Sequence, residues 1–299
     1  MKHIAIAGVT GFVGRGLAAL CDQAGIAVTG ISRSGGGDVP GVRTWQSTQA
    51  MDFAGCDAVI NLAGEPIDRR WTDARKKQFH ASRVGFTNQV VAALAECPQA
   101  ARPQVLVNAS AVGIYADRGD EVLEESSAAG EGYLADLCGD WEAAAMAAHA
   151  HDVRVVSMRI GVVLGQGGPA WQKLSRVFRF GLGGRLGHGR QWMPWIHVDD
   201  LRAALLHAAT CTELSGPVNA AAPDVVRNSE FTRQLAAELG RPAFFPAPAL
   251  ALRLVLGEFA SVLLASQRVV PAGLLASGFQ FRHPALAGAL KDLNKPSAG

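Results

Sequence analysis

Three glycines near the N-terminus constrain the fold of this chain more than any other feature. Gly8, Gly11 and Gly14 directly follow the apolar run 4–7 and precede a helical pattern of apolar residues over 17–21. In a strand–turn–helix unit the first glycine permits the tight turn, the second lets the backbone approach a pyrophosphate, and the third lets helix and strand pack closely. Free N–H groups at the helix start favour phosphate charge. The spacing therefore predicts a dinucleotide-binding turn; a glycine-rich turn that holds no ligand is the alternative.

Strand-like apolar runs alternate with helical patterns along the first half of the chain. Strands are expected at 27–31, 57–64, 103–110 and 153–164, and helices at 71–95 and 134–149. This alternation is typical of parallel βαβ units, whose ligands bind at the carboxyl ends of the strands. We predict an α/β fold with a doubly wound parallel sheet of the Rossmann type and a smaller C-terminal substrate subdomain. We expect the NADP-binding Rossmann domain to comprise 1–165 plus about 195–220, and the substrate-side subdomain to comprise about 166–194 and 221–299.

Composition and charge narrow the function classes. The chain has 299 residues, of which 18% are charged, and a net charge of +2 without a basic run. The average globular chain has roughly 25% charged residues. We therefore expect a sizeable core and a possible homo-oligomer interface, but neither a nucleic-acid partner nor an anionic membrane partner.

Cysteine usage and the late apolar stretch indicate the compartment. The five cysteines are dispersed without a CxxC pair, which is typical of reduced intracellular thiols and predicts neither disulfides nor a metal site. The stretch 244–270 is interrupted by Arg253, Glu258 and Arg268, whereas a membrane span needs about 20 mostly uncharged residues. No signal peptide fits before the first strand. A soluble, cytoplasmic protein is expected.

The residues after the second expected strand indicate which dinucleotide is bound. Ser32 and Arg33 stand where an Asp or Glu would hold the 2′-hydroxyl of NAD. They suit a 2′-phosphate, so we expect NADP(H) rather than NAD(H), with a merely exposed Arg33 as the alternative. Ala63 and Gly64 would let the cofactor lie against the backbone, and Arg83 is either a phosphate or ribose partner or a solvated, ion-paired arginine. The predicted cofactor contacts are Gly8, Thr10, Gly11, Phe12, Val13, Gly14, Ser32, Arg33, Leu62, Ala63, Gly64, Arg83, Ser110 and Val162.

Several longer motifs together resemble a known superfamily. GVTGFVG at 8–14, NLAG at 61–64, SAVGIY at 110–115 and WIHVDDL at 195–201 are similar to the extended short-chain dehydrogenase/reductases. More narrowly, the chain resembles the YfcH-type epimerase family in NLAGEPI, RRW, CGDWE, RIGVVLGQGG, GLGGRLGHGRQWMP, SQRVVP and GFQF, from Ile4 to about Leu290. The resemblance implies a Rossmann domain that binds NADP(H) and a C-terminal subdomain that forms the substrate side, without a defined substrate.

The resemblance also implies catalytic residues that this chain lacks. Enzymes of the superfamily use a Ser or Thr after the fifth strand and a Tyr-x-x-x-Lys on the next helix, whose lysine lowers the tyrosine pKa. Leu137 stands four residues after Tyr133, and alignment on Glu142 places Leu134 and Cys138 at the tyrosine and lysine positions. Neither register contains the dyad.

Tyr115 and Ser110 remain as catalytic candidates, because Ser110 ends the expected strand 103–110 and Tyr115 lies just past it. An unassisted phenol titrates near pH 10, so Tyr115 would serve better as a proton donor than as a base. Reduction of a carbonyl by NADPH would then be easier than oxidation. A packed Tyr115 ring with a satisfied hydroxyl is the alternative.

The glycine-rich segment 181–189 and the residues after it are predicted to contact the substrate. The candidates there are His188, Arg190, Gln191 and Trp192. Asp199 and Asp200 either act as acid and base or cap the helix expected from 201, and His197 is interpreted as packed. Cys138 is either a nucleophile or, without a neighbouring cation, a helix-packing residue.

These patterns favour one function and leave two others open. The first is an NADP(H)-dependent oxidoreductase that reduces a small carbonyl substrate. The second is a protein that uses bound NADP(H) as a structural or sensing ligand without turnover. The third is a sugar-nucleotide epimerase, against which the missing lysine counts because epimerisation requires removal of a hydroxyl proton.

Overall fold

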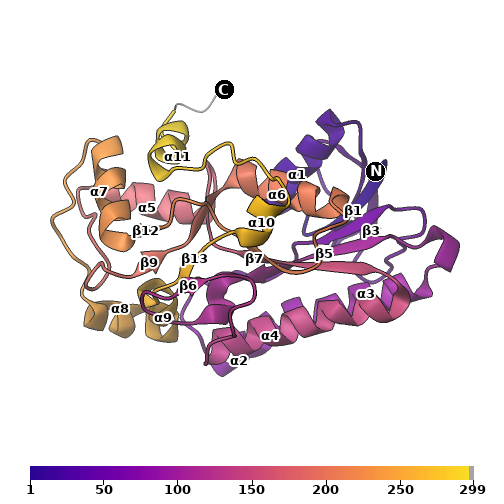
Figure 1. Ribbon diagram of the computed structural model, residues 1–299, viewed down its shortest axis with the longest axis horizontal. Coiled ribbons are helices and arrows are strands. Elements are labelled where there is room, and N and C mark those ends of the chain that lie inside the picture. The colour runs from indigo at the N-terminus through magenta and orange to yellow at the C-terminus, as the bar shows by residue number, and fades with distance from the viewer. Residues whose placement is uncertain (296–299) are drawn as a thin grey trace.

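A seven-stranded parallel sheet forms the centre of the computed structural model, which describes residues 1–295 (Figure 1). The strands lie in the order β11-β7-β5-β4-β1-β2-β3, and every neighbouring pair is parallel. Their bounds are His3–Ala7 (β1), Ala27–Ser32 (β2), Val42–Ser47 (β3), Ala58–Asn61 (β4), Val105–Ala111 (β5), Arg154–Ile160 (β7) and Gly216–Ala220 (β11). This is the predicted doubly wound Rossmann-type sheet.

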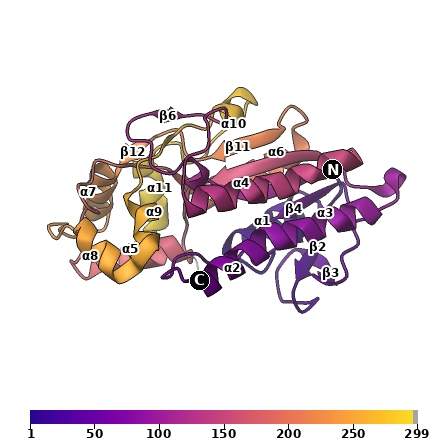
Figure 2. The same cartoon turned by 90° about the horizontal axis from the view of Figure 1, so that it is seen from below.

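Helices cover both faces of this sheet. α1 (Phe12–Gln23) and α6 (Val198–Thr210) lie on one face, and α3 (Phe86–Glu96) and α4 (Tyr133–Met146) lie side by side on the other (Figure 2). Ile4 and Ile6 pack into the layer of α1 and α6, whereas Ala5 and Ala7 pack into the layer of α3. Because both faces of β1 are buried, the strand is apolar over 4–7 instead of alternating.

The run 153–164 was expected as one strand, and this expectation is wrong in one respect. β7 ends at Ile160, and Val162–Leu164 forms β8, which leaves the main sheet and pairs with β10 (Trp195–His197). At the bend, the Gly161 N–H donates to the Ala220 carbonyl and the Val162 N–H donates to the Pro194 carbonyl. A Cβ at Gly161 would lie 3.0 Å from the Pro194 oxygen, so the crossing of these backbones favours glycine.

Two further differences concern β3 and the helix expected at 71–95. β3 was missed because it is a polar edge strand with no fully buried residue. The expected helix is divided into α2 (Asp73–His80), a π-helical turn over Ala81–Gly85, and α3. Such wide turns frequently occur at functional sites.

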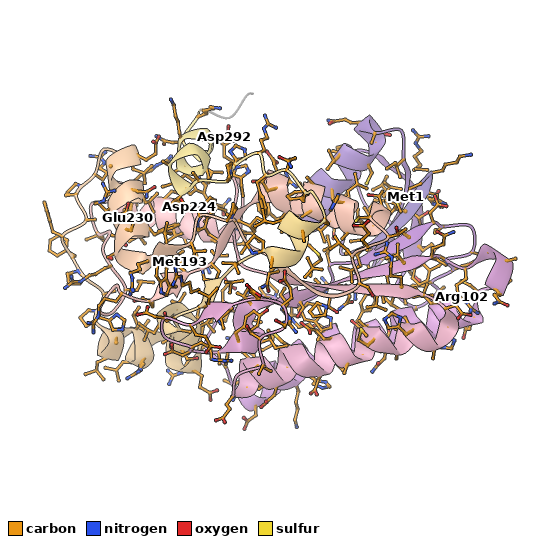
Figure 3. The ribbon with its side chains drawn as sticks, viewed as in Figure 1. Met1, Arg102, Met193, Asp224, Glu230 and Asp292 are labelled. Carbon is orange, nitrogen blue, oxygen red and sulfur yellow. The ribbon has the colours of Figure 1, made fainter. Side chains whose placement is uncertain are left out.

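The remaining elements gather beyond the carboxyl end of the sheet. They include α5 (Pro169–Arg179), β9 (Trp192–Met193), β12 (Val226–Arg227), α7 (Asn228–Glu238), α8 (Ala249–Leu256), α9 (Ala260–Leu264) and α11 (Leu286–Leu293). Figure 3 shows this end, marked by Asp224, Glu230 and Asp292, opposite the end that carries Met1 and Arg102. Their core contains Trp171, Trp195 and Phe231.

The chain returns to the main sheet before its last helix. β13 (Arg268–Val269) pairs with β6 (Val122–Leu123), and α10 (Ala272–Ala276) packs against β11 with Leu274 in the core of the α1 and α6 layer. The C-terminal region is therefore interleaved with the sheet. Within the described residues, every helix is too short or too polar to cross a membrane.

Candidate functional site

A cavity of about 410 Å³ opens at the carboxyl ends of β1, β4, β5 and β7. It lies where the strand order reverses, with β2 on one side of β1 and β4 on the other. This is the position at which doubly wound sheets bind dinucleotides. The lining residues are mainly small and apolar: Gly8, Gly11, Phe12, Val13, Gly14, Leu62, Ala109, Ile160, Val162, Val163, Pro169, Ala170 and Leu201.

The glycine turn has the geometry that its spacing predicts. Gly8 adopts a φ of +76°, and a Cβ there would lie 2.9 Å from the backbone of Leu62. A Cβ at Gly14 would lie 2.5 Å from the Gly8 carbonyl oxygen, because α1 crosses very close to β1. Gly11 is the N-cap of α1 and supplies no capping side chain, and the first turn has no acidic residue. The first N–H groups of α1 are therefore free to bind an anion.

Arg202 supports this turn from α6. Its guanidinium donates to the Phe12 carbonyl (3.0 Å) and to the Val13 carbonyl (3.4 Å), and it pairs with Asp199 (3.0 Å). Thr10 is exposed and outside the cavity lining, and its carbonyl accepts a hydrogen bond from Arg15.

The residues predicted to select the cofactor stand at the end of β2. The Arg33 side chain is 91% exposed, and its nearest acidic partner is Glu65 at 3.8 Å. The Ser32 hydroxyl donates to the Gly36 carbonyl and accepts from the Gly36 N–H. The loop after β2 is thus closed by a serine, and the Arg33 side chain stays exposed beside Glu65.

Half of the six cavity residues that the sequence did not single out come from β8 and the segment after it. These three are Val163, Pro169 and Ala170, and the others are Ala109, Ile160 and Leu201. The place of the first three depends on the bend at Gly161, where β8 leaves the main sheet. The succession of Gly165, Gly167 and Gly168 before Pro169 was the only signal in the sequence.

Tyr115 does not reach the cavity, so its predicted role as proton donor is wrong. The residue is 0% exposed. Its hydroxyl donates to Asn219 Oδ1 (2.8 Å) or to the Glu124 carbonyl (3.1 Å), and it accepts from Arg159 Nη1 (2.8 Å). Burial raises the pKa of Tyr115. The alternative interpretation, a packed ring with a satisfied hydroxyl, describes this residue.

Ser110 belongs to the same buried network and is also a packing residue here. Its hydroxyl donates to Glu142 Oε1 (2.6 Å), and Glu142 forms a two-pronged pair with Arg159 through Nε (2.9 Å) and Nη2 (2.9 Å). Asn219 extends the network by donating to the carbonyls of Leu123 and Val270. Because Ser110 lies outside the cavity lining, its predicted cofactor contact is also missing from this geometry.

At the positions where a Tyr-x-x-x-Lys should stand, α4 carries apolar and neutral groups. Leu134 packs against Gly113, and Cys138 is 1% exposed. Burial raises the pKa of Cys138 to about 12, so this thiol packs in the helix interface and is no nucleophile. Tyr133 donates to the Lys76 carbonyl (3.0 Å) and stacks edge-on with Trp71 at 5.3 Å between ring centres.

The predicted substrate residues divide into two pairs. His188 and Arg190 are exposed, with the Arg190 N–H bonded to His188 Nδ1. Gln191 is 2% exposed and donates to the Leu186 carbonyl, which is a structural role. Trp192 donates to Asp120 Oδ1 (2.8 Å), and the guanidinium groups of two arginines, 227 and 268, lie 4.5 and 4.9 Å from its ring centre. All four lie outside the cavity lining.

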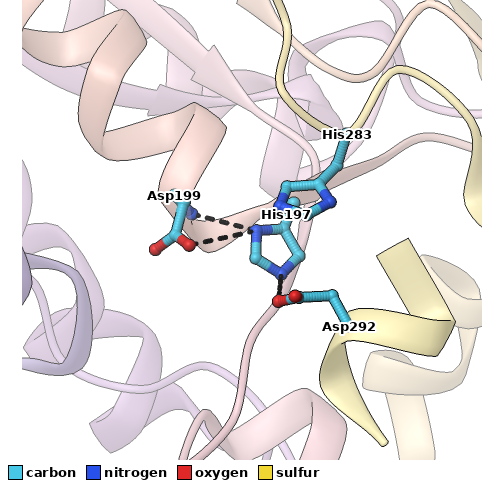
Figure 4. Close-up of side chains that lie close together, drawn as sticks. All are labelled: His197, Asp199, His283 and Asp292. Atoms are coloured by element: carbon cyan, nitrogen blue, oxygen red, sulfur yellow. Dashed lines mark hydrogen bonds and ion pairs between the residues drawn. The ribbon is translucent and has the colours of Figure 1, made fainter. Parts of the chain in front are cut away.

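A cluster of two histidines and two aspartates lies at the start of α6 (Figure 4). It contains His197, Asp199, His283 and Asp292, whose ligand atoms lie within 4.8 Å of one another, close enough to be considered for a metal ion. His197 Nδ1 accepts the Asp199 N–H and so caps α6. A neutral ring then carries its proton on Nε2, which faces Asp292 Oδ2 at 3.6 Å. Nε2 is buried without a hydrogen-bond partner, and its approach to Asp292 places His197 between α6 and α11.

Asp199 and Asp200 therefore do not cap α6, contrary to expectation, because His197 does. Asp200 is 1% exposed and accepts from the backbone N–H groups of Arg282 (2.7 Å) and His283 (2.9 Å). Both of its oxygens hold the C-terminal segment against α6, and the carboxylate lies outside the cavity lining.

A parallel sheet of this order, with a glycine turn over a cavity at its switch point, defines a Rossmann-type dinucleotide-binding protein. The comparisons agree, and the chain belongs to the NAD dependent epimerase/dehydratase family, whose profile matches residues 4–221. Residues 247–293 match a second profile, a domain of unknown function (DUF1731).

Relatives extend over almost the whole chain. The chain is 39% identical over 297 residues to the "Epimerase family protein SDR39U1 homolog, chloroplastic" of Arabidopsis thaliana, covering 96% of this chain and 85% of that protein. The crystal structure of human epimerase family protein SDR39U1 (isoform 2) with NADPH has a TM-score of 0.88 at 36% identity, covering 98% and 99% of the two chains. A nucleoside-diphosphate sugar epimerase from Corynebacterium glutamicum has a TM-score of 0.78 at 33% identity, covering 98% of this chain and 58% of the other.

Proposed function

We propose that this protein binds NADP(H) and uses it to reduce a small polar carbonyl compound. The observation that carries the cofactor assignment is the open cavity under the glycine turn, with an exposed Arg33 and no acidic residue within β2 or at its end. The human relative, crystallised with NADPH, supports the same cofactor. Within the family, we assign the chain to the YfcH-type epimerases.

The substrate would enter from the side of the C-terminal elements. The exposed His188 and Arg190 are the polar groups that we propose for its recognition. Hydride would pass from the reduced nicotinamide to the carbonyl carbon. The proton would come from water, because among the described residues none that lines the cavity has a titratable side chain.

The lack of a titratable side chain among the described residues that line the cavity also favours a second candidate, in which bound NADP(H) is a structural or sensing ligand. A cavity without a titratable group can bind a cofactor and still lack a proton donor. Epimerisation of a sugar nucleotide, the activity in the name of the Corynebacterium glutamicum relative, is the weaker proposal because it also needs a base.

Thermal unfolding with each of NADP⁺, NADPH, NAD⁺ and NADH tests the cofactor assignment. A ligand that binds only the folded state at 100 times its Kd adds about 2.7 kcal/mol of stability. That corresponds to a rise in Tm of roughly 4 °C for a chain of this size. We expect this rise with NADP(H) only, and we expect Arg33→Asp to remove or reverse the preference. Equal shifts with all four dinucleotides would refute the selectivity, and no shift, with no nucleotide released on denaturation, would refute the site.

Turnover then separates the two candidates. Oxidation of NADPH, followed by its absorbance over a panel of aldehydes, ketones and keto acids, should exceed the rate without protein. If NADPH binds tightly and no carbonyl increases its oxidation, the sensing function replaces the reductase.

A further inference from the structure

Exposed apolar side chains gather in two segments of the C-terminal region. Among the described residues twelve large apolar side chains are exposed, and eight of them lie within 177–182 and 244–255. Phe244 is 81% exposed and Leu254 is 70% exposed. The eight side chains are Val177, Phe180, Leu182, Phe244, Phe245, Leu250, Leu254 and Val255. Single exposed apolar residues are ordinary on a protein surface, whereas a gathering of this kind marks an interaction site.

Backbone contacts bring the two segments together. The Gly187 N–H donates to the Ala247 carbonyl (2.8 Å), and the Ala247 N–H donates to the Arg185 carbonyl (2.9 Å). Gly184 passes so close to Phe245 that a Cβ on the glycine would lie 1.8 Å from the Phe245 oxygen. Figure 1 shows α8, which follows this crossing, at the end of the molecule away from β1 and β3. The two groups of exposed side chains therefore share one region of the molecule.

Helix α8 presents an apolar face to solvent. Seven of its eight residues are apolar, and none of them is buried. Leu250, Leu254 and Val255 are exposed, and their spacing places them on one face of the helix. Most helical stability in proteins comes from packing such a face against another element. Within the described chain, this face of α8 therefore lacks a packing partner.

The same stretches of chain carry positive charge and no carboxylate. Residues 169–190 and 241–257 contain one lysine, six arginines and no Asp or Glu. Their seven positive charges exceed the net charge of +2 of the whole chain, so the rest of the chain is net negative. Five exposed arginines form neither an ion pair nor a side-chain hydrogen bond within residues 1–295, namely Arg176, Arg179, Arg185, Arg241 and Arg253. Together with the eight apolar side chains, they make up what we call the outer surface.

The charge and apolarity of the outer surface select its partner. A second copy docked through the same surface would place arginines against arginines, because a twofold contact pairs a patch with itself. An anionic bilayer offers both complements, since lipid phosphates attract guanidinium groups and the acyl boundary takes up Phe and Leu side chains. The net charge and the lack of a basic run hide this property in the sequence, because apolar residues separate the cations.

We propose that the outer surface docks the protein on membranes that contain anionic lipids. Phe244, Phe245 and the exposed face of α8 enter the boundary between headgroups and acyl chains, and the five arginines bind lipid phosphates. The contact is peripheral, because α8 has eight residues and a membrane-spanning helix needs about 20. The cavity is lined by the opposite end of α5, at Pro169 and Ala170, so the docked protein can still bind NADP(H).

Cosedimentation of the full chain with lipid vesicles tests the proposal. Vesicles of phosphatidylcholine alone are compared with vesicles of phosphatidylcholine and phosphatidylglycerol in equal parts. Each arginine near an anionic membrane is worth roughly fivefold in binding. We expect binding to the anionic vesicles to be at least about tenfold tighter than binding to the neutral ones. It should fall when the salt is raised from about 0.1 M to about 1 M, which shortens the screening length from about 10 Å to about 3 Å.

Two double variants remove the two components of the outer surface separately. Phe244→Ser/Phe245→Ser should weaken binding to anionic vesicles at least about tenfold, because burial of even one Phe side chain is worth roughly tenfold or more. Arg176→Gln/Arg179→Gln should weaken it roughly ten- to thirtyfold. Because all four side chains are exposed, both variants should keep the unfolding temperature and the NADPH Kd of the wild type.

Lys2→Gln/Arg43→Gln is the matched control. It removes two exposed positive charges beside β1 and on β3, at the other end of the molecule. This variant should bind anionic vesicles as the wild type does.

The outcomes distinguish the membrane from other partners. Absence of binding to anionic vesicles, equal binding to both kinds of vesicle, or wild-type binding in both surface variants overturns the proposal. If the protein ignores vesicles but binds polyglutamate through Arg176 and Arg179, the partner is an acidic polypeptide and the membrane assignment is overturned. Because docking and cofactor binding use different residues, vesicle binding by a protein that binds no NADP(H) would leave this proposal standing and refute only the proposed function.

Discussion

The buried pair between Glu142 and Arg159 offers a quantitative test of the claim that the Ser110–Tyr115 network is structural. The two side chains are 13% and 9% exposed, and they share two hydrogen bonds of 2.9 Å. Removal of one member leaves the other charge uncompensated in a poorly solvated place. For such pairs the loss is about 3–5 kcal/mol of unfolding free energy. We therefore expect Glu142→Gln and Arg159→Met each to lower Tm by roughly 5–8 °C.

The double variant Glu142→Gln/Arg159→Met should be much less destabilised than the sum of the two single variants. Neither charge remains in it, and replacing both members of a buried pair is often nearly neutral. Urea unfolding followed by circular dichroism gives all three changes in unfolding free energy. Because neither residue lines the cavity, the Kd for NADPH should be unchanged in each folded variant.

Two results would refute this reasoning. Single variants that lose less than about 1 kcal/mol would mean that the pair is solvated, and additive losses would mean that the charges do not interact. A large effect on NADPH turnover without an effect on stability would return Ser110 and Tyr115 to the active site.

Three further predictions concern other parts of the fold. Gly14→Ala should weaken NADPH binding and cost about 1–3 kcal/mol of stability, because its Cβ would lie 2.5 Å from the Gly8 oxygen; an unchanged Kd and Tm would contradict this. A thiol reagent near neutral pH should label only the partly exposed Cys211 in the native protein, since the other four cysteines are buried, and all five in denaturant. A second thiol that reacts fast in the native protein would contradict this burial. Asp200→Ala leaves two backbone N–H groups unpaired, so hydrogen exchange of the amides over 282–293 should accelerate. Unchanged exchange there would show that Asp200 does not hold the C-terminal segment against α6.

The sequence alone predicts the parts of the fold that depend on local pattern. The apolar runs of β1, β4, β5 and β7 are visible because a parallel strand buried on both faces is mostly apolar instead of alternating. The glycine turn can be predicted because two of its positions exclude a side chain. A Cβ at Gly8 would collide with the Leu62 backbone, and a Cβ at Gly14 would collide with the Gly8 carbonyl oxygen. β3 is an exposed edge strand, and its polar residues carry no such pattern.

The catalytic interpretation failed for a different physical reason. A tyrosine after β5 has the same sequence context whether its ring turns toward a cofactor or into the interior. The direction is decided by Arg159 and Asn219, which lie 44 and 104 residues further along the chain and bind the hydroxyl. Likewise, the bend that creates β8 depends on the distant Pro194 and Ala220 backbones.

Helix α6 connects the two parts of the chain that match different family profiles. At its start, Arg202 holds the glycine turn while its partner Asp199 belongs to the cluster that meets α11. Two paired residues of α6, Arg202 and Asp199, thus connect the glycine turn to the cluster at α11. A protein cut between the two profiles, after residue 221 and before 247, would lose this connection. We therefore expect the region called a domain of unknown function to unfold together with the nucleotide-binding part of the chain.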